Sequence, residues 1–340
     1  MSSDQNLQNY LFDSVLAKYP KKADAISALA DLLGVGSDAV YRRVRGDSDL
    51  TPKEISLIAN KFKISVDSHI FNETDHISFQ FNPFVRTIKT FDDYLDDIHA
   101  DVRALGSIPN VMVYYASSEI PIFYYIAEPE LFSFKLYVWG RSIWNFAYLQ
   151  NEDFHFGLIP PNVLEKAKEV WRLYKMQGSV EMWSLNIVDN TLNQIEYHFH
   201  TNSFKERNDA LGLCDKLLKL AHKLEVMAQQ GSKVDTHSAH GNGGSNFTLY
   251  HNEIIYTNNT IMVDSPHFKS VYTTFGNPNF LKSSDLRLFN YTQKWFNDVI
   301  AKSTQISLHG EKNRKWFFDR LYRRIETVKQ RIELSLNDRF

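Results

Sequence analysis

The sequence predicts a mainly α-helical protein that folds in three parts, and three observations support this fold class. At 340 residues the chain is more than twice as long as a typical domain of about 150 residues, so we expect at least two hydrophobic cores. Apolar residues recur with helical spacing through most of the chain, whereas β-forming runs occur only at 111–115 and in the last third. Polar segments at 72–76 and 231–246 divide these regions.

The composition is that of an ordinary globular protein. Hydrophobic residues make up 43% of the chain and charged residues 23%, which argues against a disordered, collagen-like or membrane-spanning protein. No stretch reaches the roughly 18 apolar residues that a membrane span needs, and no signal peptide is recognisable. The single Cys214 excludes an intrachain disulfide and fits a reducing compartment. We therefore expect a cytoplasmic protein with no membrane partner.

The first two parts are both expected to be helical. Residues 1–72 contain five short helical stretches separated by turn signals. Residues 78–230 are rich in aromatic side chains and read as a mainly helical sensor or interaction domain. Its helical patterns lie at 91–105, 130–144, 161–176, 187–199 and 205–229. The glycine-rich segment 231–246 is predicted to be a flexible linker or exposed loop, because it holds too few apolar residues to order itself.

Residues 247–340 are predicted to form a small α+β unit that ends in a long basic helix. Asn-rich turn signals separate β-forming runs at 247–250, 253–257 and 260–264, and helical patterns follow at 284–302 and 311–334. The last helix carries apolar residues three and four apart, as in a heptad seam: Phe318, Leu321, Ile325, Val328 and Ile332. This helix is expected to dock on its own domain, to form a dimer seam, or to offer a second nucleic-acid surface.

The sharpest local signal is the segment 26–46, ISALADLLGVGSDAVYRRVRG. An apolar helical face leads to Gly34, where the helix must stop and turn. Ser37 is predicted to be the N-cap of a second short helix whose Val40 and Val44 face inward. A helical wheel places Asp38, Arg42 and Arg45 opposite Val40, with Tyr41 and Arg43 on the flanks.

The spacing Ala30-x3-Gly34-x5-Val40 supplies a small residue where two helices cross, a tight turn and an apolar anchor. This segment resembles the helix-turn-helix of lambda-repressor-like (Xre family) regulators of bacteria and phages, which often ends in an Arg-Gly pair, as Arg45-Gly46 does here. The resemblance extends over about 70 residues, through the capping box 51–54 to a fifth helix opened at 65–67. It departs at Arg43, where the family often has an aliphatic residue.

The resemblance implies a five-helix domain that reads double-stranded DNA. Arg42 and Arg45 would contact guanine edges or phosphates, and Tyr41 would contact a phosphate or a thymine methyl group. Ser37 and Asp38 would make the contacts at the start of the helix. Arg43 belongs to the same basic patch. Residues 1–72 hold 6 Lys and 3 Arg against 8 Asp and 1 Glu, whereas 41–46 carry three arginines and no acid. Attraction to phosphates is therefore expected to be focused on this helix.

No metal or cofactor is expected. His198 and His200 would project about 200° apart on the predicted helix, and His237 and His240 have no further ligand at a suitable spacing. The glycine run 241–244 follows no predicted strand and opens no helix, so it lacks the context of a phosphate-binding loop.

These features predict a sequence-specific transcription regulator and not an enzyme. Its C-terminal region would sense a small-molecule or protein effector and set the oligomeric state, and a homodimer is expected because one helix-turn-helix reads only a half-site. The effector pocket is expected among the aromatic side chains of 111–144, namely Tyr114, Tyr115, Phe123, Tyr124, Tyr125, Tyr137, Trp139 and Trp144. The alternatives are an enzyme or toxin-like effector in residues 78–340 with an autoregulatory N-terminal domain, or a protein-interaction scaffold.

Overall fold

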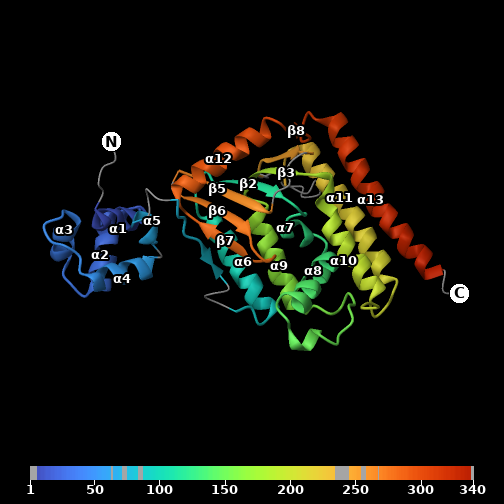
Figure 1. Ribbon diagram of the computed structural model, residues 1–340, viewed down its shortest axis with the longest axis horizontal. Coiled ribbons are helices and arrows are strands. Elements are labelled where there is room, and N and C mark those ends of the chain that lie inside the picture. The colour runs from blue at the N-terminus through green and yellow to red at the C-terminus, as the bar shows by residue number, and fades with distance from the viewer. Residues whose placement is uncertain are drawn as a thin grey trace. The chain divides into compact units, whose positions relative to one another are not determined.

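The computed structural model of the protein describes residues 6–62, 64–70, 75–82, 87–233, 245–253, 258–266 and 268–337. The chain forms two compact units, Met1–Phe79 and Gln80–Phe340 (Figure 1). The division between them falls close to the polar break that the sequence predicts after residue 72. Among the described helices, none combines the length and the apolar character that crossing a membrane requires.

The first unit is a bundle of short helices, as the sequence predicts for residues 1–72. They are α1 (Leu7–Leu16), α2 (Lys22–Leu33), α3 (Ser37–Val44), α4 (Pro52–Phe62) and α5 (Asp67–Ile70). Their apolar faces meet in one core, where Leu11 of α1, Leu29 of α2, Val40 of α3 and Ile58 of α4 are each fully buried. A core this small depends on each of these side chains, because burying one stabilises the fold by about 1.5–3 kcal/mol.

The ends of these helices follow the predicted signals, with one correction. Gly34 ends α2 in the left-handed conformation, with φ of 66°. Thr51 and Glu54 form the predicted capping box, in which the Thr51 amide donates to Glu54 and the Glu54 amide donates to Thr51. The prediction that Ser37 caps α3 is wrong. Gly36 occupies the N-cap position without a side-chain hydrogen bond, and Ser37 is the first helical residue.

The second unit is built on an eight-stranded mixed sheet, counted over the described residues, in the order β1-β7-β6-β5-β2-β3-β4-β8. The strands β2, β3 and β4 at its centre are parallel, and every other pair is antiparallel. The strands are β1 (Gln80–Phe81), β2 (Met112–Ser117), β3 (Gly178–Trp183), β4 (Phe247–His251), β5 (Thr260–Asp264), β6 (Lys269–Thr274), β7 (Phe280–Ser283) and β8 (Thr304–Gln305).

Long helical crossovers connect the parallel strands, as a parallel sheet requires. Between β2 and β3 lie α7 (Ile122–Tyr125), α8 (Pro129–Ser142), the 3-10 helix η2 (Ala147–Leu149) and α9 (Pro161–Tyr174). Between β3 and β4 lie the 3-10 helix η3 (Leu185–Val188), α10 (Asp189–His200) and α11 (Asp209–Gln230). The remaining helices are α6 (Phe91–Gly106), α12 (Leu286–Ile300) and α13 (Glu311–Asn337).

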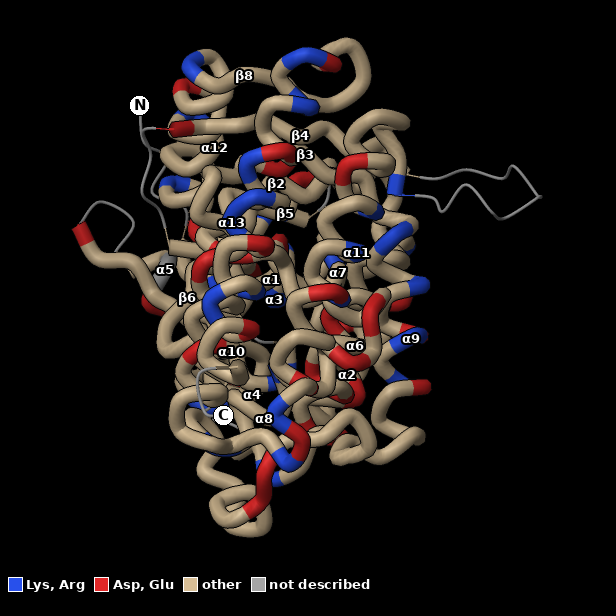
Figure 2. The backbone as a smooth tube through the Cα atoms, turned by 90° about the vertical axis from the view of Figure 1, so that its right-hand side faces the viewer, with Lys and Arg blue, Asp and Glu red and all other residues tan. Residues whose placement is uncertain are grey.

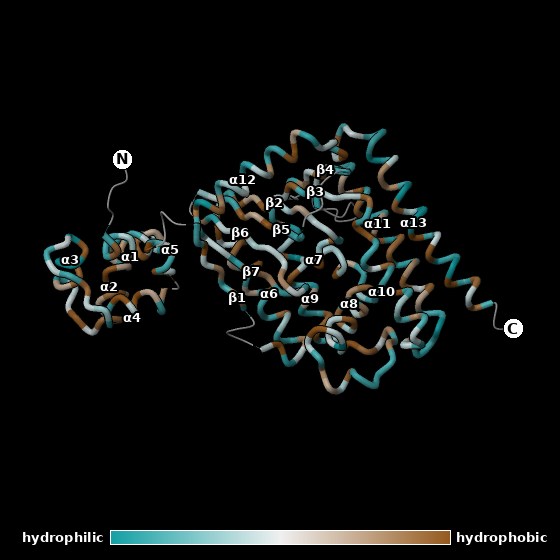
Figure 3. The backbone as a smooth tube through the Cα atoms, in the orientation of Figure 1, coloured by the Kyte–Doolittle hydropathy of each residue, from teal (hydrophilic) through white to brown (hydrophobic). Residues whose placement is uncertain are grey.

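The sheet lies between two unequal helical layers. Side chains alternate between the faces of a strand, so neighbouring residues of β3 face different layers. Met182 packs against Phe289 and Phe296 of α12, whereas Trp183 belongs to the large aromatic core formed with the crossover helices and α13. Along α11 and α13 apolar and polar segments alternate (Figure 3), as expected for helices with one face in a core.

The structure corrects the predicted division of residues 78–340. Strand β2, from the expected helical domain 78–230, pairs with β5, from the expected separate unit 247–340, and both belong to one compact unit. The sequence pattern hides this because pairing between distant segments leaves no local signal. Strands β4 and β5 lie where strands were predicted at 247–250 and 260–264. Most of the predicted linker 231–246 and of the predicted strand 253–257 lies outside the described residues.

Helix α13 docks on its own unit, which was the first of the three expected roles of the C-terminal helix. The seam residues Phe318, Leu321, Ile325, Val328 and Ile332 are all buried in the large core. Basic and acidic residues alternate along the helix (Figure 2). Ion pairs join it to its neighbours: Arg331 with Glu196 and Arg324 with Asp189 of α10, at 2.9 and 2.7 Å, and Lys329 with Asp215 of α11 at 2.7 Å.

Candidate DNA-binding surface

Helix α3 presents a polar, cationic face on the first unit. Val40 is completely buried and holds the helix against the core. On the opposite side Arg42 and Arg45 are exposed, and Tyr41 on the flank leaves 37% of its surface exposed, as the helical wheel predicted. Ser37 and Asp38 are also exposed, at the start of the helix. The helix lies at the edge of the first unit (Figure 1).

Two of the three arginines, Arg42 and Arg45, are exposed enough to bind an external anion. Arg42 has no ion pair with any carboxylate in the part of the chain that the structure describes. Arg45 Nε lies 3.1 Å from an Asp47 carboxylate oxygen, and both side chains are more than half exposed. Because water and salt screen such an exposed pair, exchanging Asp47 for a DNA phosphate costs Arg45 little.

Arg43 has a different environment from Arg42 and Arg45. One guanidinium nitrogen lies 2.9 Å from Glu54 of α4, and the other donates to the main-chain carbonyl of Ala39 at 3.2 Å. Burial acts to raise the pKa of Glu54, but hydrogen bonds from Thr51 and the charge of Arg43 outweigh it and hold that pKa below its ordinary value. Arg43 therefore ties α3 to α4, and its charge is largely neutralised within the unit.

Sequence analysis did not identify Gln8 of α1, which positions the end of α3. Its amide group donates to the carbonyl of Arg43 at 2.8 Å and to that of Ser48 at 3.0 Å, and its carbonyl oxygen accepts from the amide of Leu50 at 2.6 Å. The side chain is only 5% exposed. A polar residue among the apolar positions of α1 was the one signal in the sequence, and nothing local indicates what it would contact.

The aromatic residues expected to line a pocket instead fill the core of the second unit. Tyr124, Tyr125, Tyr137 and Trp139 are buried there. Tyr124, Tyr137 and Trp139 make ring contacts with other aromatic core residues, and the Tyr125 hydroxyl forms a hydrogen bond with that of Thr191. Tyr115 is buried as well. Phe123 and Trp144 pack on the same core, and Tyr114 lies on the other face of the sheet, against Phe296. Most of these side chains therefore serve the core, while Tyr115 and Trp139 also line a small cavity of about 20 Å³ beside Glu119 and Lys135.

This core contains two buried charged clusters that sequence analysis missed. Glu119, just after β2, accepts from Lys135 of α8 at 2.9 Å and from Asn190 of α10 at 2.6 Å, and Asn277 also donates to it. Burial acts to raise the pKa of Glu119, but the charge of Lys135 and the three hydrogen bonds hold it below its ordinary value. The cluster joins four segments that are far apart in the sequence.

The second cluster surrounds Glu181 at the centre of β3. Its carboxylate accepts from the side chains of Tyr124, Tyr174, Ser179 and Trp183, at distances between 2.6 and 3.2 Å. Lys233 Nζ lies 4.0 Å from this carboxylate and 3.9 Å from the centre of the Tyr174 ring, with no exposed surface. Burial lowers the pKa of Lys233 to about 8, although the charge of Glu181 opposes the shift.

The described residues contain no group of three His, Cys, Asp or Glu side chains that could hold a metal ion. His198 and His200 both lie on α10, as predicted, and His237, His240 and the glycine run 241–244 lie outside the described residues. Comparison of the chain with models of protein families, with curated proteins and with solved structures found no match.

Proposed function

We propose that the protein is a sequence-specific DNA-binding transcription regulator that reads the major groove with α3. The observation that carries this proposal is the exposed pair Arg42 and Arg45 on a short helix anchored by the buried Val40. The major groove of B-DNA admits one α-helix, and arginine is the residue that most often reads guanine there. The resemblance of residues 26–46 to the Xre helix-turn-helix supports the same reading.

Within this proposal the residues of α3 divide into two groups. Arg42, Arg45 and Tyr41 are exposed and would contact bases or phosphates, with Ser37 and Asp38 at the start of the helix. Arg43 is committed to Glu54 and would act by holding α3 in place. The second unit would bind an effector and pair two chains, so that two α3 helices meet two half-sites. Because the α13 seam is buried in the core, that pairing would use a different surface.

The buried charged residues of the second unit are the observation that favours an enzyme instead. Both clusters, however, are satisfied internally. Glu119 accepts from three side chains, and Glu181 from four. A general acid or base must be within hydrogen-bond reach of the substrate proton that it transfers. The oxygens of these two carboxylates instead accept hydrogen bonds from neighbouring side chains. We therefore propose a regulator in preference to an enzyme.

Selection of binding sites from random duplex DNA by the full-length protein tests this function directly. We expect one recurrent sequence, bound more weakly as salt rises, and lost when Arg42 and Arg45 are both replaced by alanine. Arg172→Ala is the matched control, because Arg172 is an exposed arginine of α9 in the second unit, paired with Glu169. A failure to enrich any sequence, or equal binding by the double variant, would contradict the proposal.

A further inference from the structure

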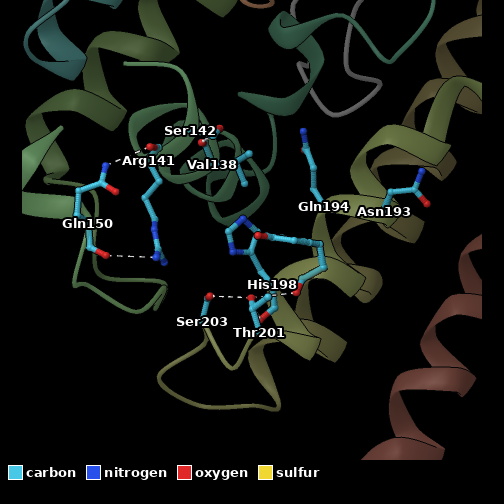
Figure 4. Close-up of a pocket in the computed structure, with 10 residues that line it drawn as sticks. Val138, Arg141, Ser142, Gln150, Asn193, Gln194, His198, Thr201 and Ser203 are labelled. Atoms are coloured by element: carbon cyan, nitrogen blue, oxygen red, sulfur yellow. Dashed lines mark hydrogen bonds between the residues drawn. The ribbon is translucent and has the colours of Figure 1, made fainter. Parts of the chain in front are cut away.

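A polar pocket of about 640 Å³ opens between α8 and α10 in the second unit (Figure 4). Ligand pockets commonly enclose about 300–1,000 Å³, so this one is large enough for a small metabolite. Its walls come from α8, from α10, from the turn after α10 and from Gln150 after η2. None of the residues that line it is an aspartate or a glutamate.

Arg141 supplies the positive charge of the pocket. Its guanidinium donates to the carbonyl of Gln150 at 3.2 Å, and the Gln150 amide donates back to the Arg141 carbonyl at 3.1 Å (Figure 4). The guanidinium also donates to the hydroxyl of Tyr137. These bonds hold the side chain in place without neutralising it. No ion pair joins Arg141 to a carboxylate anywhere in the described part of the chain.

Gln194 adds oriented donors. Its carbonyl oxygen accepts from the buried Lys135 ammonium at 3.0 Å. Because an ammonium can only donate, this contact fixes which end of the amide is the oxygen and leaves the two amide N–H groups for the pocket. The same Lys135 also donates to Glu119, so Gln194 connects the pocket to the buried charged cluster that joins α8, α10 and β2.

His198 is a buried polar residue on the pocket wall. It is 7% exposed and packs against the rings of Phe134 and Tyr137, with centroid distances of 5.7 and 5.4 Å. Its Nδ1 has no hydrogen-bond partner among the described residues. A buried polar atom without a partner is uncommon in folded proteins, and a small shift of the imidazole that brings this atom to a bound ligand would satisfy it.

We propose that this pocket binds a small organic anion through its carboxylate or phosphate group. The Arg141 guanidinium and the Gln194 amide are the principal donors, since charge-assisted hydrogen bonds to anions are the strong ones. His198 contributes a further polar contact. The absence of acidic residues from the lining selects against cations. Regulation of DNA binding by this anion rests on the proposed function, whereas the binding itself does not.

Calorimetry and thermal unfolding of the full-length protein with succinate, inorganic phosphate and uncharged succinamide, at constant ionic strength, test the site. We expect saturable binding of at least one anion, with a rise in unfolding temperature, and none of succinamide. The two anions separate a carboxylate ligand from a phosphate ligand. Arg141→Gln is expected to weaken binding by roughly tenfold or more, whereas Arg172→Gln leaves it unchanged.

Two further measurements test whether the anion binds in this pocket or elsewhere on the second unit. Arg323 belongs to a neighbouring arginine-lined groove between α10 and α13. Arg323→Gln is expected to leave anion binding unchanged. In the parent protein the bound anion is expected to shift the imidazole resonances of His198, assigned by their loss in His198→Gln. The proposal is overturned if neither anion binds, if Arg323→Gln weakens binding as much as Arg141→Gln does, or if saturation leaves the His198 resonances unmoved. Such a result would leave the DNA-binding proposal intact.

Discussion

The side-chain amide of Gln8 donates a hydrogen bond to the main-chain carbonyl of Arg43, 2.8 Å away, and so joins α1 to the last turn of α3. The carbonyls at the end of a helix have no partner within the helix. The carbonyl of Arg43 accepts from the Gly46 amide just beyond the helix as well as from Gln8, and Gln8 also fixes the loop that follows through Ser48 and Leu50. The position of the exposed face of α3 therefore depends on a residue that faces the core of the first unit.

Replacing Gln8 by leucine should destabilise the first unit without removing any group that would touch DNA. The buried amide of Leu50 and the carbonyl of Ser48 lose the partner that Gln8 supplies, and the carbonyl of Arg43 keeps only the Gly46 amide, which should cost about 2–4 kcal/mol in the free energy of unfolding. Hydrogen exchange at the Leu50 amide is the measurement, because it reports this unit alone. Unchanged exchange at Leu50 would show that the three hydrogen bonds contribute nothing to the stability of the unit.

The ion pair between Arg43 and Glu54 gives Arg43 a structural role, whereas Arg42 is proposed to contact DNA. We expect Arg43→Ala to lower the stability of the first unit by about 1–3 kcal/mol, because Glu54 then keeps a partly buried charge without its partner. Its effect on DNA affinity should be reproduced by Glu54→Ala, which leaves all three arginines in place. If Arg43→Ala weakens DNA binding and Glu54→Ala does not, Arg43 contacts DNA directly.

Sequence analysis located the helices well because apolar spacing and capping residues are local signals. The capping box at Thr51 and Glu54 and the left-handed Gly34 both lie where the pattern predicted them. Strand β3 was not predicted, because what makes it a strand is not local in the sequence. The strand contains the charged Glu181. It pairs with β2, which comes before it in the chain, and with β4, which comes after it. No alternation marks a central strand that is buried on both faces.

The candidate sites show the same limit. The exposure of Arg42 and Arg45 follows from their angle to Val40 on one helix, so the sequence was sufficient to predict it. The commitment of Arg43 to Glu54 and the role of Gln8 depend on how separate helices pack. The polar pocket beside Arg141 likewise requires α8 and α10 to lie side by side, and their sequences contain no signal for that contact.

The stability of the second unit should rise with pH above about 8, because of Lys233. Burial lowers the pKa of this group to about 8 from its ordinary value of 10.5. Between these values the unfolded chain holds the proton and the folded chain has released it, so raising the pH favours the folded state, by about 1 kcal/mol per pH unit. Urea unfolding of the parent and of Lys233→Met between pH 8 and 9.5 measures this. Parallel curves for the two proteins would exclude the effect.

The burial of the α13 seam makes that helix part of the core. Ile325→Ala should lower the stability of the second unit by about 2–5 kcal/mol, whereas Leu334→Ala, at a position that is 63% exposed, should change it by about 0.5 kcal/mol or less. A chain that ends at Lys302 should therefore unfold or aggregate. A stable, folded chain ending at Lys302 would contradict the core role of α13.

Sedimentation of the full-length chain should give a homodimer formed through a surface other than the α13 seam.

The DNA-binding proposal depends most on Arg42 and Arg45. If either arginine makes a bidentate contact with a guanine, its replacement by alanine should cost roughly 1–3 kcal/mol of binding free energy and relax the preference at one base position. An arginine that meets only phosphate should instead weaken binding to all sequences and reduce the salt slope by about 1.

Neither change should alter the stability of the first unit by more than about 0.5 kcal/mol, since both side chains are exposed. Val40→Asp is the contrasting control, because it places an unpaired charge in the core and should unfold the unit. Binding to the selected DNA, measured over a range of salt concentrations, decides between the outcomes. A double variant that binds as tightly as the parent, with the same salt slope, would mean that α3 is not the recognition helix.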